Sequence, residues 1–235
     1  MSETIVSMEN ICKSFPGVKA LDHVHFELRS GEVMALLGEN GAGKSTLMKI
    51  LTGVYTKDKG TVLVDGREVN YKNPQEAEKA GIVFIHQELN VLFDLTVEEN
   101  LFMGKEIKKK FGFCDQKAMR KKAEEALGRL GVRIDPGEVM SNLSVGQQQM
   151  IEIAKALMVD AKVIIMDEPT AALTQSETTV LFQVVNSLRE KGVSIVYISH
   201  RMDEIFKITD RITVLRDGVM MGTFPISETS TEALI

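Results

Sequence analysis

The order of apolar and polar residues predicts a run of strands in the first part of the chain. The segment Leu21–Leu28 alternates apolar and polar residues through Val24, Phe26 and Leu28, which is the period of a half-buried strand. The segment Glu32–Leu37 is almost wholly apolar and predicts a buried strand, and Ile5–Met8 is a shorter strand candidate. The chain is therefore expected to begin with β-structure.

Turn and cap residues place the next elements. Gly60–Val64 and the Asp-Gly turn after it favour a β-hairpin, so the N-terminal third is expected to be antiparallel. Asn73 followed by Pro74, with Glu76 close behind, predicts the start of a helix. After that helix, Ile82–Ile85 is predicted to be a short buried strand.

From about residue 90 the strand pattern gives way to helical signals. Thr96 and Glu99 form a capping box, and Asp115 is placed to cap a second helix. Apolar residues then recur at helical spacing over 145–158. These signals predict a helical subdomain over residues 90–160.

Strands and helices alternate again after residue 160. The predicted elements are strands at Val163–Met166, Ser194–Ile198 and Arg211–Leu215, and a helix at about Ser176–Lys191. Buried strands joined by helices favour a parallel sheet. The chain therefore predicts one α/β domain, with a core at residues 1–89 and 161–235 and the helical subdomain inserted between them.

Composition limits the function classes. The 235 residues are 44% hydrophobic and 26% charged, which suits one packed domain, and the net charge of −5 argues against nucleic-acid binding. No apolar run reaches the roughly 18–20 residues that span a bilayer, so we expect a cytosolic chain whose membrane role comes through a partner. Cys12 and Cys114 match no metal or redox spacing, and both are expected to be reduced.

A phosphate-binding pattern, G-x-x-x-x-G-K-[ST], lies between the strand at Glu32–Leu37 and a predicted helix at Thr46–Leu51. In this pattern backbone N–H groups cradle the phosphates, the lysine reaches the β and γ oxygens, and the hydroxyl holds Mg²⁺. An ordinary turn is the alternative, but it requires neither the two glycines nor Lys and Ser. The predicted ATP-binding residues here are Gly38, Asn40, Gly41, Gly43, Lys44, Ser45 and Thr46.

Two acidic residues follow the strand at Val163–Met166. Asp167 stands at the carboxyl end of that strand, where open α/β sheets bind ligands, and we expect it to hold Mg²⁺ opposite Ser45. Glu168 comes next and is expected to polarise the water that attacks the γ-phosphate. The alternative is a simple helix cap, which Pro169 opposes because it blocks an immediate helix start.

Together with Leu143–Gln147, these motifs resemble those of ATP-binding-cassette (ABC) transporter ATPases. The segment Leu-Ser-Val-Gly-Gln is similar to the signature loop of that family, usually L-S-G-G-Q. The resemblance covers essentially the whole chain and implies a P-loop NTPase (RecA-like) parallel-sheet core with an N-terminal antiparallel β subdomain. It also implies that Ser144, Gly146 and Gln147 contact ATP held by a second cassette, a role that is compatible with helix capping by Ser144.

The resemblance assigns roles to three further residues. Phe15 matches the aromatic residue that stacks on adenine, although an edge packing residue would have the same pattern. Gln87 matches the glutamine that touches Mg²⁺ or the attacking water and joins the core to the helical subdomain. His200 matches the histidine that contacts the γ-phosphate, whereas a lone histidine is more often a surface or core residue. Glu168, Gln87 and His200 are then the expected catalytic residues, and Ser45, Gln87 and Asp167 the expected metal ligands.

Longer stretches narrow the resemblance to the first half of bacterial monosaccharide-importer ATPases of the ribose, galactose, arabinose and xylose type. The similar stretches are Phe15–Leu21, His86–Asn90, Val145–Lys155 and Ile198–Ile205. Members of that branch carry two cassettes, so this chain is expected to be the N-terminal half of a longer tandem-cassette chain, and residues 227–235 are expected to begin a helix.

The same resemblance implies the partners. They are a second ABC cassette, present as a tandem half or a homodimer, transmembrane permease subunits, and indirectly a periplasmic or extracellular sugar-binding protein. The expected location is the cytoplasmic face of a bacterial membrane, and no nucleic-acid partner is expected.

Two residues depart from the family pattern. Val145 replaces the first signature glycine, and a β-branched residue tolerates positive φ poorly. Thr174 stands where the family usually has Asp. The resemblance therefore does not say which residue of this chain would carry the communication across the cassette interface that the family assigns to that Asp.

Three alternative functions are each opposed by a feature of the sequence. A cytosolic cassette protein that acts on ribosomes or DNA is opposed by the acidic charge balance. A small-molecule P-loop kinase is opposed by Leu143–Gln147. An inactive interaction module is opposed by the catalytic set, namely Lys44, Asp167, Glu168 and His200.

Overall fold

The computed structural model describes residues 3–110 and 112–230, which form two compact units. The core unit comprises the residues up to Phe84, Ala161–Glu168 and the residues from Leu188 onward, and the helical unit comprises Ile85–Asp160 and Pro169–Ser187. The predicted boundaries at residues 89/90 and 160/161 stay a prediction. The observed helical unit also includes residues 169–187, which the sequence predicts to be part of the core.

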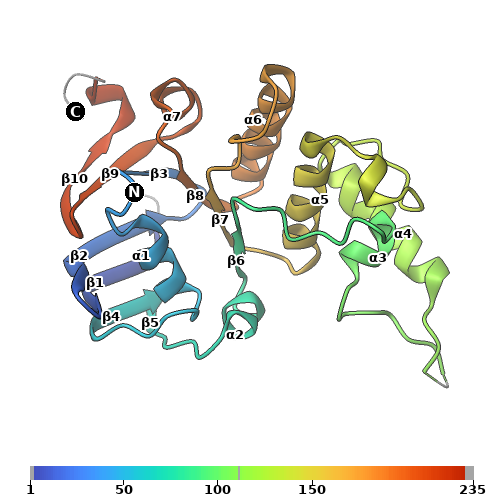
Figure 1. The fold of residues 1–235 in the computed structure, drawn as a ribbon, viewed down its shortest axis with the longest axis horizontal. Coiled ribbons are helices and arrows are strands. Elements are labelled where there is room, and N and C mark those ends of the chain that lie inside the picture. Colours follow the sequence, from blue (N-terminus) through green and yellow to red (C-terminus); the bar gives the residue numbers. More distant parts are fainter. Residues whose placement is uncertain (1–2, 111, 231–235) are drawn as a thin grey trace. The chain divides into compact units, whose positions relative to one another are not determined.

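The antiparallel part of the core unit is a four-stranded sheet in the order β2-β1-β4-β5 (Figure 1). Its strands are β1 (Thr4–Phe15), β2 (Val18–Arg29), β4 (Lys59–Val64) and β5 (Arg67–Glu68). β1 and β2 are longer than predicted because irregular register interrupts their alternation. Asn10 and His23 have φ values of 52° and 50°, so the two-residue period that marks a strand in sequence is lost at these points.

The second sheet of the core unit has six strands in the order β10-β9-β3-β8-β7-β6 (Figure 1). They are β3 (Val33–Leu37), β6 (Ile82–Ile85), β7 (Val163–Asp167), β8 (Ser194–Ile198), β9 (Arg211–Arg216) and β10 (Val219–Pro225). β3 pairs in parallel with β8 and β9, and β7 pairs in parallel with β8, which confirms the predicted parallel-sheet core. β10 is antiparallel to β9 and was not predicted.

Strand β3 shows how this sheet is buried on both faces. Met34 and Leu36 belong to the main apolar core together with α1 (Lys44–Leu51) and the antiparallel sheet. Ala35 and Leu37 point to the opposite face and pack with Ile205 of α7 (Met202–Ile208). Burial of each such aliphatic side chain contributes about 1.5–3 kcal/mol, so the end of β3 is firmly held.

The helical unit contains α3 (Val97–Leu101), α4 (Gln116–Arg129), a 3-10 turn at Met140–Asn142 and α5 (Val145–Met158). Thr96, Asp115 and Ser144 accept the capping bonds that the sequence predicts. The three helices share one apolar core that includes Leu101, Leu127 and Ile151. Local capping and a common core therefore fix the start of α5.

The remaining elements are α2 (Pro74–Lys79), with the predicted Asn73 cap, α6 (Gln175–Glu190), and a 3-10 turn at Ile226–Glu228. The helix expected at 227–235 falls partly on residues 231–235, which lie outside the described residues. Across residues 3–110 and 112–230, none of the helices combines the length and the apolar character needed to cross a membrane.

Candidate nucleotide-binding and catalytic site

The loop between β3 and α1 has the backbone that a phosphate-binding loop requires. Gly41 and Gly43 have φ values of 85° and 103°, in the region that favours glycine. Gly43 is the N-cap of α1, and Lys44 and Ser45 are its first two helical residues. The loop therefore leads into a helix N-terminus, where unpaired N–H groups and the helix dipole favour an anion.

We expect Gly43→Ala to cost more stability than Gly41→Ala. A Cβ at Gly43 would lie 2.7 Å from the carbonyl oxygen of Ala20, whereas a Cβ at Gly41 would have no neighbour within 4 Å. Both variants bear the backbone strain of positive φ, on the order of 1–3 kcal/mol, but only Gly43→Ala adds a clash. Urea unfolding of the two variants measures the difference, and equal losses would contradict this account of Gly43.

Lys44 is buried and turned back onto its own loop. Its Nζ donates hydrogen bonds to the carbonyl oxygens of Gly38 and Glu39 at 2.8 and 2.9 Å. Burial lowers the pKa of Lys44 below its usual value, and the nearby carboxylates of Glu168 and Asp167 oppose that shift. The loop thus holds a buried cation that hydrogen-bonds to two carbonyl oxygens, which favours an anionic ligand.

Ser45 and Asp167 meet across the carboxyl ends of β3 and β7. The hydroxyl of Ser45 donates to Asp167 Oδ2 at 3.0 Å. Two oxygens that share an octahedral Mg²⁺ at 2.0–2.1 Å are separated by roughly 2.9 Å, so this oxygen pair fits the spacing of two neighbouring magnesium ligands. Their chemistry also fits, since hydroxyl and carboxylate oxygens are ligands that Mg²⁺ prefers.

Glu168 is held in an unusual backbone conformation at the end of β7. Its φ is 47°, and its N–H donates to the carbonyl oxygen of Ile198 on β8 at 2.9 Å. This turn brings its largely buried carboxylate to the exposed ring of His200, where Oε1 lies 2.8 Å from Nδ1. A non-glycine residue in this region costs about 1–3 kcal/mol, a strain often found at functional sites.

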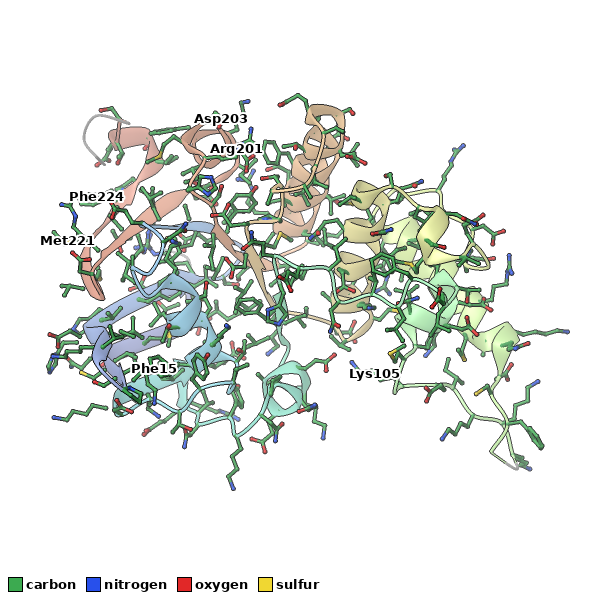
Figure 2. The ribbon with its side chains drawn as sticks, viewed as in Figure 1. Phe15, Lys105, Arg201, Asp203, Met221 and Phe224 are labelled. Carbon is green, nitrogen blue, oxygen red and sulfur yellow. The ribbon has the colours of Figure 1, made fainter. Side chains whose placement is uncertain are left out.

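A cavity of about 470 Å³ opens beside this cluster in the core unit. Its lining includes Glu39, Asn40 and His200, together with Met221 and Phe224 of β10. Figure 2 shows Met221 and Phe224 on this strand. The sequence analysis missed the β10 contribution, because Gly222 and Pro225 weaken the strand signal there.

Phe15 lies at the end of β1, where it packs against Tyr55. The two ring centroids are 5.2 Å apart in an edge-to-face arrangement, and Lys13 Nζ lies 5.4 Å from the Phe15 centroid. These contacts are those of a packed aromatic residue, and the adenine-stacking role of Phe15 stays a prediction.

The signature-like loop is the start of α5 in the helical unit. Ser144 and Gln147 form a capping box, in which Gln147 Oε1 accepts from the Ser144 N–H at 2.9 Å. Val145 is the first helical residue and does not have a positive φ, so its β-branched side chain is accommodated without the expected restriction. Val145 therefore replaces glycine here at no backbone cost.

Glu177, a residue that the sequence analysis missed, joins this loop. Its Oε1 accepts from the Ser144 hydroxyl at 2.8 Å and from the Gly146 N–H at 3.2 Å. The spacing from Thr174 to Glu177 matches a capping box and could have identified Glu177 as structural, but nothing in the sequence pairs it with Ser144. Gln87 is an exposed residue of the same unit, two residues beyond β6, and its catalytic and metal-binding roles stay predictions.

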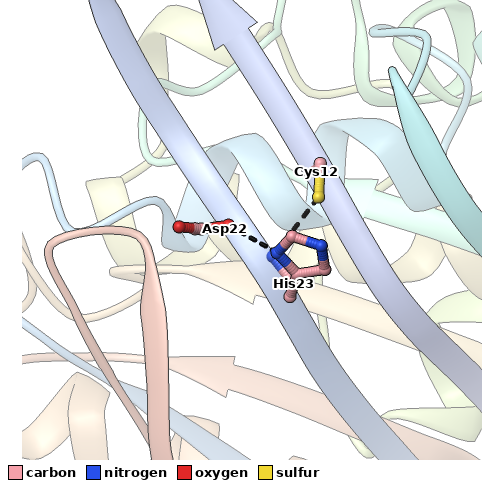
Figure 3. A group of neighbouring side chains, drawn as sticks. All are labelled: Cys12, Asp22 and His23. Carbon is pink, nitrogen blue, oxygen red and sulfur yellow. Dashed lines mark hydrogen bonds and ion pairs between the residues drawn. The ribbon is translucent and has the colours of Figure 1, made fainter.

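Cys12, Asp22 and His23 come together on the β1–β2 hairpin (Figure 3), with potential ligand atoms within 4.8 Å of one another. Asp22 is already satisfied, because Oδ1 lies 2.6 Å from His23 Nδ1 and Oδ2 lies 2.7 Å from Lys19 Nζ. The hydrogen bond from Lys19 helps to hold the pKa of Asp22 below its usual value. The carboxylate is thus engaged within the hairpin, and we assign no metal to this group.

Comparisons with known proteins agree with this architecture. A family model described as ABC transporter matches residues 21–171. The ribose import ATP-binding protein RbsA of Lactococcus lactis is 57% identical over 98% of this chain and 47% of the relative, and that of Halalkalibacterium halodurans is 58% identical over 98% and 46%. The chain therefore spans about half the length of these relatives.

Solved structures give the same result. A nucleotide-free ATP-binding cassette from an ABC transporter is 30% identical, with a TM-score of 0.87 over 98% of this chain and 97% of that one. A dimeric cassette bound to ADP and Pi is 27% identical, with a TM-score of 0.79 over 94% and 98% of the two chains. With its mixed α/β fold, its phosphate-binding loop and these matches, the chain belongs to the ABC transporter family.

Proposed function

We propose that this chain binds MgATP and hydrolyses ATP to ADP and phosphate as the energy-coupling subunit of a monosaccharide importer, with ribose or a similar sugar as the substrate. The observation that carries the proposal is the cluster at the carboxyl ends of β3, β7 and β8. There Lys44, the Ser45–Asp167 pair and the Glu168–His200 pair lie in one unit. Cation, metal ligands and base are the parts that phosphoryl transfer to water requires.

The residues of the phosphate-binding loop bind and orient the nucleotide. The N–H groups from Gly41 to Thr46 donate to the phosphate oxygens, and Lys44 exchanges the carbonyl oxygens of Gly38 and Glu39 for phosphate oxygens. Ser45 and Asp167 would hold Mg²⁺, which supplies positive charge that draws electrons from the transferred group. Asn40 and Gly38 shape the loop around the γ-phosphate.

Glu168 is the proposed general base. Its carboxylate follows the metal ligand Asp167 directly, and its hydrogen-bond partner is the ring of His200. Glu168 accepts a proton from the attacking water, while His200 holds the carboxylate in position and contacts the γ-phosphate. Gln87 is the further proposed ligand of the metal or of the attacking water.

We further propose that two cassettes complete each site, with Ser144, Gly146 and Gln147 of one contacting the nucleotide of the other. These groups form a helix N-terminus that suits an anion. Related cassettes have been solved as dimers, which supports this arrangement. The second cassette is either another copy or a tandem half.

If each site needs Ser144 from a partner, the ATPase rate of this chain should rise faster than linearly with its concentration. Doubling the concentration of a weakly associating chain increases the dimer about fourfold, so the rate per chain should also increase. Steady-state ATPase assays over a wide concentration range, with sedimentation in parallel, measure this dependence. A strictly linear rate from a chain that sediments as a monomer would contradict the shared site.

Sugar import is supported by the names of the relatives, which are ribose import ATP-binding proteins. In this role the chain sits at the cytoplasmic face of the membrane and works with permease subunits, and a sugar-binding protein delivers the substrate. The test is a reconstituted transporter whose ATPase activity is measured with a panel of sugars and the binding protein. Stimulation by ribose or a close analogue is expected, and stimulation by none of the sugars would contradict the assignment.

A cytosolic ABC ATPase that acts on ribosomes or DNA is the alternative. The net charge of −5 disfavours it, since nucleic-acid binders usually present a basic surface.

A further inference from the structure

The start of α5 is occupied by a carboxylate from within the same unit. Glu177 Oε1 accepts two hydrogen bonds there, from the Ser144 hydroxyl at 2.8 Å and from the Gly146 N–H at 3.2 Å. Its other oxygen, Oε2, accepts from the N–H and the hydroxyl of Thr174 at 2.9 and 2.8 Å. One side chain therefore bridges the signature-like loop and the start of α6.

This contact is close and specific. A Cβ added at Gly146 would lie 2.5 Å from the Glu177 carboxylate, so only glycine lets the carboxylate approach the loop backbone. The hydrogen bonds from the Thr174 N–H and then from the Ser144 hydroxyl lower the pKa of Glu177 to about 2. Glu177 is consequently ionised at neutral pH, and the group that fills the helix N-terminus is an anion.

The occupied groups are those that the proposed function assigns to the γ-phosphate. Ser144 Oγ has one proton to donate, and the Gly146 N–H has one. Neither proton can be donated fully to Glu177 and to a phosphate oxygen at once, and two anions at this point would repel each other. A phosphate that enters here must therefore displace Oε1.

We propose that Glu177 is a positioning residue that acts through Ser144, because its carboxylate fills the signature-loop anion site until the γ-phosphate of the other cassette replaces it. The inference rests on the proposed function, in which Ser144 and Gly146 bind that phosphate. The exchange raises the ATP concentration needed to close the two cassettes. After hydrolysis, Glu177 competes with the product phosphate for the same donors and favours reopening.

The test measures association of the cassettes in the Glu168→Gln background, where ATP is hydrolysed slowly. Glu177→Gln keeps a side chain that suits the capping box with Thr174 but removes the competing negative charge. Hydrogen bonds to a charged acceptor are roughly twice as strong as neutral ones, so the MgATP concentration for half-maximal association should fall about tenfold. Sedimentation velocity at fixed protein and increasing MgATP gives this value.

Association with MgADP separates the proposed exchange from a merely structural effect, because a structural effect would change association with either nucleotide. Because ADP has no γ-phosphate to exchange with Glu177, association with MgADP should be the same with and without Glu177→Gln. The matched control is Glu125→Gln, which removes one charge from an exposed side chain on α4 of the same unit and should change neither titration. If Glu177→Gln fails to fold, Glu177→Asp takes its place in the test. Asp keeps the charge but is too short to bridge Thr174 and Ser144 together, so this variant should also lower the MgATP concentration needed for association.

Ser144→Ala separates the inference from the function on which it rests. It should raise the MgATP requirement, since it removes a donor to the γ-phosphate. If Ser144→Ala changes nothing, the shared site is wrong and the role of Glu177 falls with it. If Ser144→Ala weakens association while Glu177→Gln leaves it unchanged or weakens it too, the shared site stands and the exchange with Glu177 is overturned.

Discussion

Replacement of Glu168 by Gln should slow ATP hydrolysis by roughly 10²–10⁴-fold, the usual contribution of a positioned general base. Gln keeps the size of Glu and can still contact His200, so the Lys44 and Ser45–Asp167 contacts to the nucleotide should remain. What it loses is the ability to accept the proton of the attacking water. ATP binding by titration calorimetry should therefore stay close to wild type while single-turnover hydrolysis falls.

The closed dimer should also last longer in Glu168→Gln, because ATP stays at the interface. Size-exclusion chromatography with MgATP should show more dimer than the wild-type chain under the same conditions. Glu68→Gln, on the exposed strand β5, is the matched control and should leave turnover unchanged. Near-wild-type turnover in Glu168→Gln would show that Glu168 is not the base, and the carboxylate would then be a structural group at the strand end.

Much of the fold could be predicted because its start and stop signals are local. Asn73, Thr96, Asp115 and Ser144 each accept a capping bond from a residue three positions later, and all four helix starts were visible in sequence. The buried strands β7 and β8 were equally visible, since a short apolar run needs no partner to be recognised.

The missed elements lack such signals. Arg201, the N-cap of α7, makes no side-chain capping bond, so no start residue marks this helix in sequence. The bulges at Asn10 and His23 hide the length of β1 and β2, because a bulge shifts the alternation by one residue.

The candidate site likewise contains residues that local sequence motifs predict and contacts that they do not predict. Lys44, Ser45 and Asp167 follow from motif spacing, because the loop geometry is encoded within a few residues. Contacts such as Glu177 with Ser144, 33 positions apart, and Glu168 with His200, 32 positions apart, depend on tertiary structure. The positive φ of Glu168 likewise has no sequence signature, since a glutamate is an unusual residue there.

Lys44→Ala should weaken ATP binding by about 1.5–3 kcal/mol, or roughly 10- to 150-fold in Kd, the range for a hydrogen bond to a charged group. The ammonium group already sits inside the loop on the Gly38 and Glu39 carbonyl oxygens, so little rearrangement is needed to reach a phosphate. Its loss leaves the phosphates without their nearest side-chain cation. ADP binding should weaken less, because the γ-phosphate contact is absent.

Since Lys44 is only 8% exposed, alanine also removes packing, and the two effects must be separated. Lys44→Met keeps most of the apolar stem and removes only the charge, so it should weaken ATP binding nearly as much as Lys44→Ala while it preserves more of the unfolding free energy. Lys59→Ala, which removes an exposed lysine of β4, should bind ATP as the wild-type chain does. Titration calorimetry with MgATP measures all three variants. If Lys44→Met binds ATP as tightly as wild type, the ammonium group does not contact the phosphates, and the loss in Lys44→Ala would be due to packing of the loop alone.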